Sequence, residues 1–204
     1  MNTKERIIDE ALTLFSINGY KGTSVKQIAD AVGIKDSSLY KHYRSKQEIL
    51  DTIIEIMRGH IKIMAEQFGL PSDDNVERAV SVYSEFDEDS FVEFSKKVFL
   101  FYSTDSYVSK FWRMGNIEQY NNQEVYKIYS KLFLSDSITY LTDLFKALQD
   151  KKVFVDNVDA KVMAVSYYSP IFFLLSKYMN VEVNEEALCM IENQSREFYR
   201  IYKI

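Results

Sequence analysis

The chain has 204 residues, of which 47% are hydrophobic and 27% are charged, and its net charge at pH 7 is −5. This globular balance excludes wholesale disorder, and the single Cys189 excludes an internal disulfide and fits a reducing cytosol. With only two prolines and six glycines the sequence favours an all-α fold, and its longest apolar stretch, residues 162–175, is too short to span a membrane.

The N-terminal segment predicts an amphipathic helix over residues 3–18. Apolar side chains recur on one face of this segment at helical spacing, and Gly19 stops the helix. Because Met1 leads directly into this charged helix, no signal peptide is visible. The buried face is expected to contain Ile7, Ile8, Ala11, Leu12 and Phe15.

Two short helices joined by a tight turn are predicted next. Ser24 is a suitable N-cap for the first, and Gly33 can end it in a left-handed conformation without a Cβ clash. Ala29 is small where the second helix, from about Asp36 to Tyr43, should cross the first. These features are typical of a helix-turn-helix, whose second helix fits the major groove of DNA.

The outward side chains of this second helix are candidates for contacts with base edges. Lys41 can donate to guanine, and Asp36 can accept from the amino group of cytosine. Alternatively, Asp36 caps the helix and is then less free to read a base. Ser24 can reach a phosphate, helped by the positive end of the helix dipole. The expected base-reading set is Lys35, Asp36, Ser37, Ser38 and Lys41.

A long fourth helix is predicted from Ser45 toward Phe68. The Ser45 hydroxyl can cap it, Glu48 can complete a capping box, and Gly69 and Pro71 end it. Charge changes sign near its start: residues 1–47 hold eight Lys or Arg and five Asp or Glu, a net +3, which leaves −8 for residues 48–204. A basic head on an acidic body can dock on DNA by one face.

Three motifs between Ile7 and Leu50 occur in a specific order: T-S-V-x-x-I-A-x-A-V-G-I, then S-L-Y-x-H-Y, then S-K-x-E-I-L. Together they resemble the tetracycline-repressor-like (TetR) family of bacterial regulators. The resemblance implies an all-α protein with an N-terminal three-helix helix-turn-helix DNA-binding domain, residues 1–46. It also implies a C-terminal helical ligand-binding and dimerisation bundle, residues 47–204, and a cytoplasmic, nucleoid-associated protein of bacteria.

The same resemblance assigns roles to four further residues. It implies that Tyr40 and Tyr43 touch the DNA backbone, that His42 lies near the sugar–phosphate strand, and that Lys46 binds a phosphate. Alternatives remain open: Tyr43 can be a core aromatic, His42 can pack against the first helix, and Lys46 can be a solvated lysine. The sequence departs from the family pattern at Lys35 and Ser37, where small residues are usual.

Six further helices are predicted, at about 74–86, 89–103, 105–115, 122–150, 158–179 and 184–202. Plausible first residues are Asp89, Asp105, Asp159 and Asn184. Pro170 is expected to kink the fifth of these helices. Cys189 is expected to be buried in the last one, since free cysteine is among the most buried residue types.

Aromatic residues are concentrated in the acidic body, because residues 83–204 hold 25 of the 30 Phe, Tyr and Trp. They can form an aromatic core, or they can line a pocket for an apolar or aromatic small molecule. By family analogy, such a ligand would move the fourth helix and so reposition the two reading heads. The candidate pocket residues are Phe94, Phe101, Tyr102, Phe111, Trp112, Tyr126, Tyr129, Phe133 and Tyr167.

The last two predicted helices have the pattern of a dimer interface. Helix 158–179 mixes small and apolar residues, namely Val162, Val165, Ser166, Ser169, Phe173 and Ser176. Helix 184–202 carries an apolar stripe of Ala187, Leu188, Ile191, Phe198, Tyr199 and Tyr202. Two such helices per subunit would make an intersubunit four-helix bundle, as in the family, and a twofold dimer would present two recognition helices to a palindromic operator. Alternatively, these stripes pack only inside the monomer.

The predicted function is a ligand-responsive transcriptional repressor that binds operator DNA as a homodimer and is released by a small-molecule effector. A transcription activator and a ligand-independent architectural or division-control protein are the alternatives. An enzyme is not expected, because no phosphate-binding loop, H-E-x-x-H, G-x-S-x-G or Cys/His cluster occurs. We therefore expect no catalytic residues, no metal and no cofactor, and no membrane partner.

Overall fold

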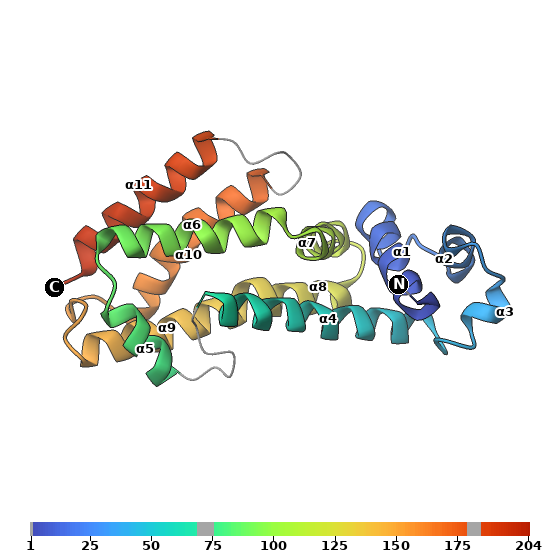
Figure 1. Cartoon of the computed structure of the whole chain (residues 1–204), viewed down its shortest axis with the longest axis horizontal. Coiled ribbons are helices and arrows are strands. Elements are labelled where there is room, and N and C mark those ends of the chain that lie inside the picture. Colours follow the sequence, from blue (N-terminus) through green and yellow to red (C-terminus); the bar gives the residue numbers. More distant parts are fainter. Residues whose placement is uncertain (1, 69–75, 179–184) are drawn as a thin grey trace. The chain divides into compact units, whose positions relative to one another are not determined.

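The computed structural model describes residues 2–68, 76–178 and 185–204, and their regular elements are helices (Figure 1). The prediction of an all-α fold is confirmed. By Cα proximity the chain forms two compact units. The first unit joins Met1–Ile61 with Ser106–Lys131, and the second joins Lys62–Asp105 with Leu132–Ile204. The expected functional division after residue 46 is not tested by this packing and stays a prediction.

The first unit begins with the three helices of the predicted head. They are α1 (Thr3–Asn18), α2 (Val25–Val32) and α3 (Asp36–Leu39). The predicted first helix is confirmed, and all five residues of its expected buried face are buried. Helix α1 packs against α2, and α2 packs against α3. The head is therefore held together by apolar side chains at helical spacing.

The predicted caps of the head are present. Gly19, with φ 76°, is the C-cap of α1. Gly33 is the C-cap of α2 and is left-handed, with φ 76° and ψ 35°. Ser24 Oγ accepts the backbone N–H of Gln27 at 3.2 Å, and the Gln27 side chain accepts the backbone N–H of Ser24 at 2.7 Å. This reciprocal pair satisfies N–H groups that the first turn of a helix leaves without partners.

Helix α4 (Lys46–Gln67) starts as predicted but with an altered capping box. The backbone N–H of Glu48 donates to Ser45 Oγ at 3.1 Å, so Ser45 caps the helix. The Glu48 carboxylate, however, accepts from the backbone N–H of Arg44 at 2.6 Å, one residue before the expected partner. The predicted stop at Gly69 and Pro71 lies outside the described residues.

Two later helices, α7 (Ser106–Glu118) and α8 (Gln123–Ser130), complete the first unit. Helix α7 packs against both α1 and α8. The helix predicted over 122–150 is not one continuous α-helix, so that expectation was wrong in one respect: the π-helical segment η1 (Lys131–Ser135) separates α8 from α9 (Asp136–Asp150). A π-helical turn bonds residue i to i+5, a local change that side-chain periodicity does not reveal.

The second unit contains α5 (Val76–Ser84), α6 (Glu88–Thr104), α9, α10 (Ala160–Tyr178) and α11 (Glu185–Tyr202). Helix α6 packs against α10 and α11, and α9 packs against α5 and α10. Asp159 caps α10 as predicted, since its Oδ1 accepts from the backbone N–H groups of Lys161 and Val162. Helix α6 starts earlier than predicted because Asp87, not Asp89, is its N-cap. The predicted start at Asn184 lies outside the described residues.

Aromatic rings form the core of the second unit. The rings of Phe91 and Phe145 each contact those of Tyr167 and Phe198, which also contact each other, at centroid distances between 5.0 and 6.0 Å. The buried Tyr167 hydroxyl shares a 2.8 Å hydrogen bond with Ser95 Oγ. The core therefore joins α6, α9, α10 and α11 through large rings with a satisfied polar tip.

An ion-pair cluster at the start of α6 holds α11 in place. Glu88 accepts from Arg196 Nη1 at 2.6 Å and from Arg200 Nη2 at 3.0 Å. Hydrogen bonds from Arg200 and Arg196 hold the pKa of the Glu88 carboxyl below its usual value. No helix among the described residues is both long and apolar enough to cross a membrane.

Candidate nucleic-acid interface

The recognition helix predicted over Asp36–Tyr43 is shorter in the structure. Helix α3 ends at Leu39, and the chain continues for one tight turn. The backbone N–H groups of His42 and Tyr43 both donate to the carbonyl of Leu39, at 2.8 and 3.1 Å. Because these two bonds converge on one carbonyl, the regular ladder stops there, although the segment stays folded against α2.

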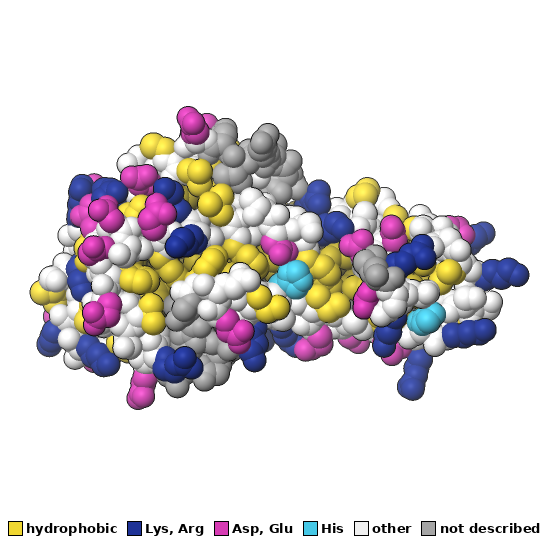
Figure 2. Space-filling view, viewed as in Figure 1, with side chains coloured by type: hydrophobic (Ala, Val, Ile, Leu, Met, Phe, Trp, Pro, Cys, Tyr) yellow, Lys and Arg dark blue, Asp and Glu magenta, His cyan; other side chains and the backbone are white. Residues whose placement is uncertain are grey.

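The polar side chains of this segment lie on an accessible surface. Lys35, Asp36, Ser37, Tyr40, Lys41 and His42 are exposed, and Ser38 is half-buried. Leu39 is fully buried between them and anchors the segment to the core. Figure 2 shows dark-blue basic side chains gathered over the end of the first unit that carries α2 and α3. The geometry therefore offers a basic, polar surface on a rigid support, which suits contact with a phosphate backbone.

Two of the open alternatives can be compared with these positions. Helix α3 starts at Asp36 itself, Lys35 occupies the N-cap position, and no side-chain hydrogen bond from Lys35 caps the helix. The alternative in which Asp36 is the cap is therefore not found. His42 is exposed, in contrast with the alternative that it packs against α1. Whether either side chain contacts DNA stays a prediction.

Tyr43 is mainly a core residue. Its side chain is 2% exposed, and the ammonium of Lys4 lies over its ring at 5.2 Å from the centroid. Burial raises the pKa of the Tyr43 hydroxyl, which therefore stays protonated and able to donate. This position agrees with the alternative of a core aromatic, while a contact of its hydroxyl with DNA stays a prediction.

Lys46 is directed at the α1–α2 loop (residues 19–24). Its Nζ donates to the carbonyls of Tyr20 and Thr23, both at 2.8 Å, and lies 4.4 Å from the centroid of the Tyr20 ring. Burial lowers the pKa of Lys46, and the nearby carboxylate of Glu118 opposes this shift. Sequence reasoning missed this role, because the carbonyl partners are 23 and 26 residues away along the chain. Its predicted phosphate contact is untested.

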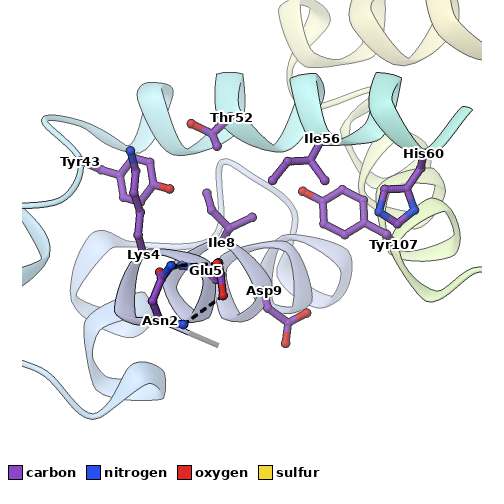
Figure 3. A pocket seen from close by; sticks show the side chains of 10 residues that line it. All are labelled: Asn2, Lys4, Glu5, Ile8, Asp9, Tyr43, Thr52, Ile56, His60 and Tyr107. Carbon is purple, nitrogen blue, oxygen red and sulfur yellow. Dashed lines mark hydrogen bonds between the residues drawn. The ribbon is translucent and has the colours of Figure 1, made fainter. Parts of the chain in front are cut away.

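A groove lies between the start of α1, the middle of α4 and the start of α7 (Figure 3). Tyr43 and Lys4 stand at one end, and the stacked rings of His60 and Tyr107, 4.9 Å apart, stand at the other. Ile8 and Ile56 line the middle. Both polar and apolar side chains line the groove, and none of the predicted ligand residues is among them.

The predicted ligand residues divide between the two units. Phe111, Trp112, Tyr126 and Tyr129 belong to the first unit, whereas Phe94, Phe101, Tyr102, Phe133 and Tyr167 belong to the second. Within each unit they contact one another: the rings of Trp112 and Tyr129 are 5.5 Å apart, and those of Tyr102 and Phe133 are 6.2 Å apart. This packing agrees with the alternative of an aromatic core. A ligand among these rings stays a prediction.

The two helices predicted to form a dimer interface differ in exposure. All six residues predicted on α10 are exposed, and Phe173 is 60% exposed. On α11, by contrast, Ala187, Ile191 and Phe198 are buried within the chain, as the monomer-packing alternative expects. The exposed side of α11 carries Met190 and Ile201 instead, and also Cys189, for which the prediction of burial was wrong. Cys189 is exposed because it lies off the apolar stripe.

Comparison with known proteins identifies the DNA-binding part. Residues 7–53 match the family described as bacterial regulatory proteins, tetR family. Residues 7–53 therefore form a DNA-binding segment of the TetR type. Members of this family are DNA-binding regulators rather than enzymes. The match covers α1, α2, α3 and the start of α4, which together carry the exposed basic surface.

Curated relatives of this chain are similar to it in the same region. The IcaR negative regulator of the biofilm operon icaADBC from Staphylococcus epidermidis is 50% identical over 52 residues, which are 26% of the chain. The IcaR protein of Staphylococcus aureus strain Newman is 48% identical over the same length. The chain spans only 28% of the length of either relative, so these matches concern the DNA-binding part.

Solved structures are similar to the chain over nearly its whole length, but in fold alone. SmeT, solved as a triclosan complex, has a TM-score of 0.70 at 18% identity and covers 99% of this chain and 92% of its own. The flavonoid-responsive regulator FrrA has a TM-score of 0.64 at 19% identity, covering 98% and 97%. The N-terminal helix-turn-helix and the C-terminal helical bundle thus share the fold of these solved structures.

Proposed function

We propose that this chain is a transcriptional repressor that binds a palindromic operator as a homodimer and is released by a small apolar or aromatic effector. The observation that carries the proposal is the match of residues 7–53 to the TetR family together with the exposed polar surface on α3. Such a protein works in the bacterial cytosol, where its operator is. The IcaR proteins, which are negative regulators similar to this chain over its head, support repression over activation.

The assignment of roles within the head follows from exposure. Lys35, Ser37 and Lys41 are exposed and are proposed to contact base edges or phosphates, with Asp36 at the first helical position able to accept from cytosine. The less exposed Ser38 is proposed to lie at the edge of the contact. Ser24 Oγ accepts the backbone N–H of Gln27 as the N-cap of α2. The same hydroxyl is proposed to contact the phosphate.

Dimerisation is proposed to use α10 and the exposed side of α11. Val162, Val165 and Phe173 expose apolar surface on α10, and Met190 and Ile201 do so on α11. A twofold dimer buries the same patch on both subunits and places two recognition helices about one turn of DNA apart. The buried stripe of α11 acts within each monomer.

The effector part of the proposal rests on ring-rich helices and on family likeness. SmeT binds triclosan and FrrA responds to flavonoids, which supports an aromatic ligand here without identifying it. The predicted ligand rings also contact one another, and rings that fill the space between helices leave less room for a ligand. These contacts therefore support the ligand-independent alternative. The two readings differ in whether any small molecule stabilises the protein.

Selection of duplexes from a random-sequence pool by the full chain tests DNA binding. We expect enrichment of a palindrome whose half-sites are about one helical turn apart. A protein of equal net charge without the helix-turn-helix serves as the control. Retention of duplexes no better than that control, in dilute buffer, would contradict the proposal.

Thermal unfolding with a panel of apolar and aromatic compounds tests the effector. A compound that binds the folded state raises the melting temperature according to its concentration relative to Kd. We expect the same compound to release the selected duplex. Tighter duplex binding would favour the activator, and a panel without any shift would favour the ligand-independent alternative.

A further inference from the structure

Glu118, the last residue of α7, is a buried carboxylate that no sequence motif singled out. Its side chain is 1% exposed. Oε1 accepts the backbone N–H of Lys21 at 3.1 Å, whereas Oε2 is buried without a hydrogen-bond partner. Burying a charged group with half of its acceptors unsatisfied is costly, so a residue of this kind needs an explanation.

Glu118 meets the α1–α2 loop at very short range. A Cβ added to Gly19 would lie 2.4 Å from Glu118 Oε1 and 2.9 Å from Ile117 Cγ2. Only glycine permits this approach, and its φ of 76° independently disfavours other residues. The end of α7 is therefore fitted against the loop, and the loop leads directly into α2, which supports α3.

Lys46, the first residue of α4, binds the same loop through hydrogen bonds. Its ammonium donates to the carbonyls of Tyr20 and Thr23, and Thr23 Oγ closes the loop internally on the Gly19 carbonyl at 2.9 Å. A carboxylate on one N–H and an ammonium on two carbonyls thus fix a short loop through groups of opposite charge. Charge-assisted hydrogen bonds of this kind are stronger than neutral ones.

Helices α4 and α7 also lie where the chain passes from one unit to the other. The backbone passes between the units within α4, before α7 and after α8. Helix α7 is held firmly inside the first unit: Gly115 lies against the Tyr129 ring of α8, and Lys110 pairs with Asp9 of α1 at 3.2 Å. A displacement of α7 would therefore act on the loop through Glu118.

We propose that Glu118 is a positioning residue that sets the orientation of the reading helices α2 and α3 by fixing the α1–α2 loop to the end of α7. The inference rests on the proposed DNA-binding function. It predicts that Glu118 controls how well the protein distinguishes its operator from other DNA. General affinity for duplexes depends on exposed basic side chains and is left unchanged.

The test compares Glu118→Ala, Glu118→Gln and wild type for binding to the selected palindrome and to a scrambled duplex of equal composition. Glu118→Ala is expected to lower affinity for the palindrome roughly tenfold or more, and Glu118→Gln, which keeps an acceptor for Lys21, to lower it less. Affinity for the scrambled duplex and the salt dependence should not fall. Glu124→Gln removes the same charge from an exposed position on α8 and is the control.

Several outcomes would overturn the inference. Glu118→Ala binding the palindrome like wild type, or losing both duplexes in parallel, would show that Glu118 does not position the reading helices. If Glu118→Ala does not fold, as judged by circular dichroism, the isosteric Glu118→Gln decides alone: unchanged palindrome preference rejects the role. If wild type itself selects no duplex, the proposed function fails rather than this inference.

Discussion

At the scale of single residues, the head uses its charged side chains in two different ways. Lys41 is exposed on the turn after α3, whereas Lys46 directs its ammonium at two backbone carbonyls. Both lysines contribute equally to net charge, but only the second also holds a loop in place. A lysine's role in DNA binding therefore depends on where its donors point, which composition does not show.

Replacing each lysine by alanine should separate these roles. Lys46→Ala is expected to lower the free energy of unfolding by about 1–3 kcal/mol, because two charge-assisted hydrogen bonds are lost. Lys41→Ala should leave stability unchanged within about 0.5 kcal/mol. Urea unfolding measures both. A Lys46→Ala protein as stable as Lys41→Ala would contradict the structural role.

Salt titrations of the same variants test the phosphate contacts. Each phosphate contact contributes about 0.9 to the slope of log K against log salt, so a variant that loses one contact shows a shallower slope. We expect this change for Lys41→Ala. The third N–H of Lys46 is the only donor not used on the loop, so an unchanged slope for Lys46→Ala would exclude its predicted phosphate contact.

At the scale of helices, glycines show where elements approach closely. Gly59 lies within α4 and Gly115 within α7, so both are interior helical positions. A Cβ at Gly59 would meet nothing within 4 Å, whereas one at Gly115 would lie 2.2 Å from Cδ2 of Tyr129. Helix propensity favours alanine at both positions equally, so any difference between them reports packing.

The pair Gly59→Ala and Gly115→Ala is therefore a matched test of the α7–α8 contact. Gly59→Ala should stabilise the protein by up to about 1 kcal/mol through propensity alone. Gly115→Ala should destabilise it by about 1–3 kcal/mol, because the Tyr129 ring must move out of a packed site. Thermal or urea unfolding gives both values. Equal effects of the two substitutions would mean that α7 and α8 are not in close contact.

At the scale of the whole molecule, regulation by a palindrome-binding protein requires two copies of the chain. The exposed apolar residues of α10 are the surface that a monomer would leave in water. Single exposed apolar residues are ordinary, but Val162, Val165 and Phe173 lie at helical spacing on one helix. A face of this kind, on which the exposed Ser166 and Ser169 lie between the apolar residues, is what an intersubunit helix pair would cover.

Introducing a charge into this stripe tests the dimer. Phe173→Lys would place an ammonium within the proposed interface, where its desolvation has no compensating partner. We expect a dimer for wild type and a monomer for Phe173→Lys by sedimentation at micromolar concentration, with weaker palindrome binding. Ile63→Lys, at another exposed apolar position that is 54% exposed, is the control and should remain dimeric. A wild-type monomer would reject the proposed interface.

The sequence by itself determined the helical fold, most helix bounds and the family of the head. Helix spacing, the caps at Ser24 and Asp159 and the glycines at 19 and 33 are local signals, because each acts on backbone groups within a few residues. The exposed base-reading candidates around α3 followed from the same local periodicity.

Only the tertiary structure decided which distant groups meet. Lys46 reaches carbonyls more than 20 residues earlier, Glu118 reaches Lys21 across 97 residues, and the stripe of α11 packs within the chain while that of α10 stays exposed. An apolar stripe is equally suited to any complementary surface, and a carboxylate to any donor. The local sequence pattern therefore shows which kind of partner a side chain requires, and the packing of the helices determines which partner it contacts.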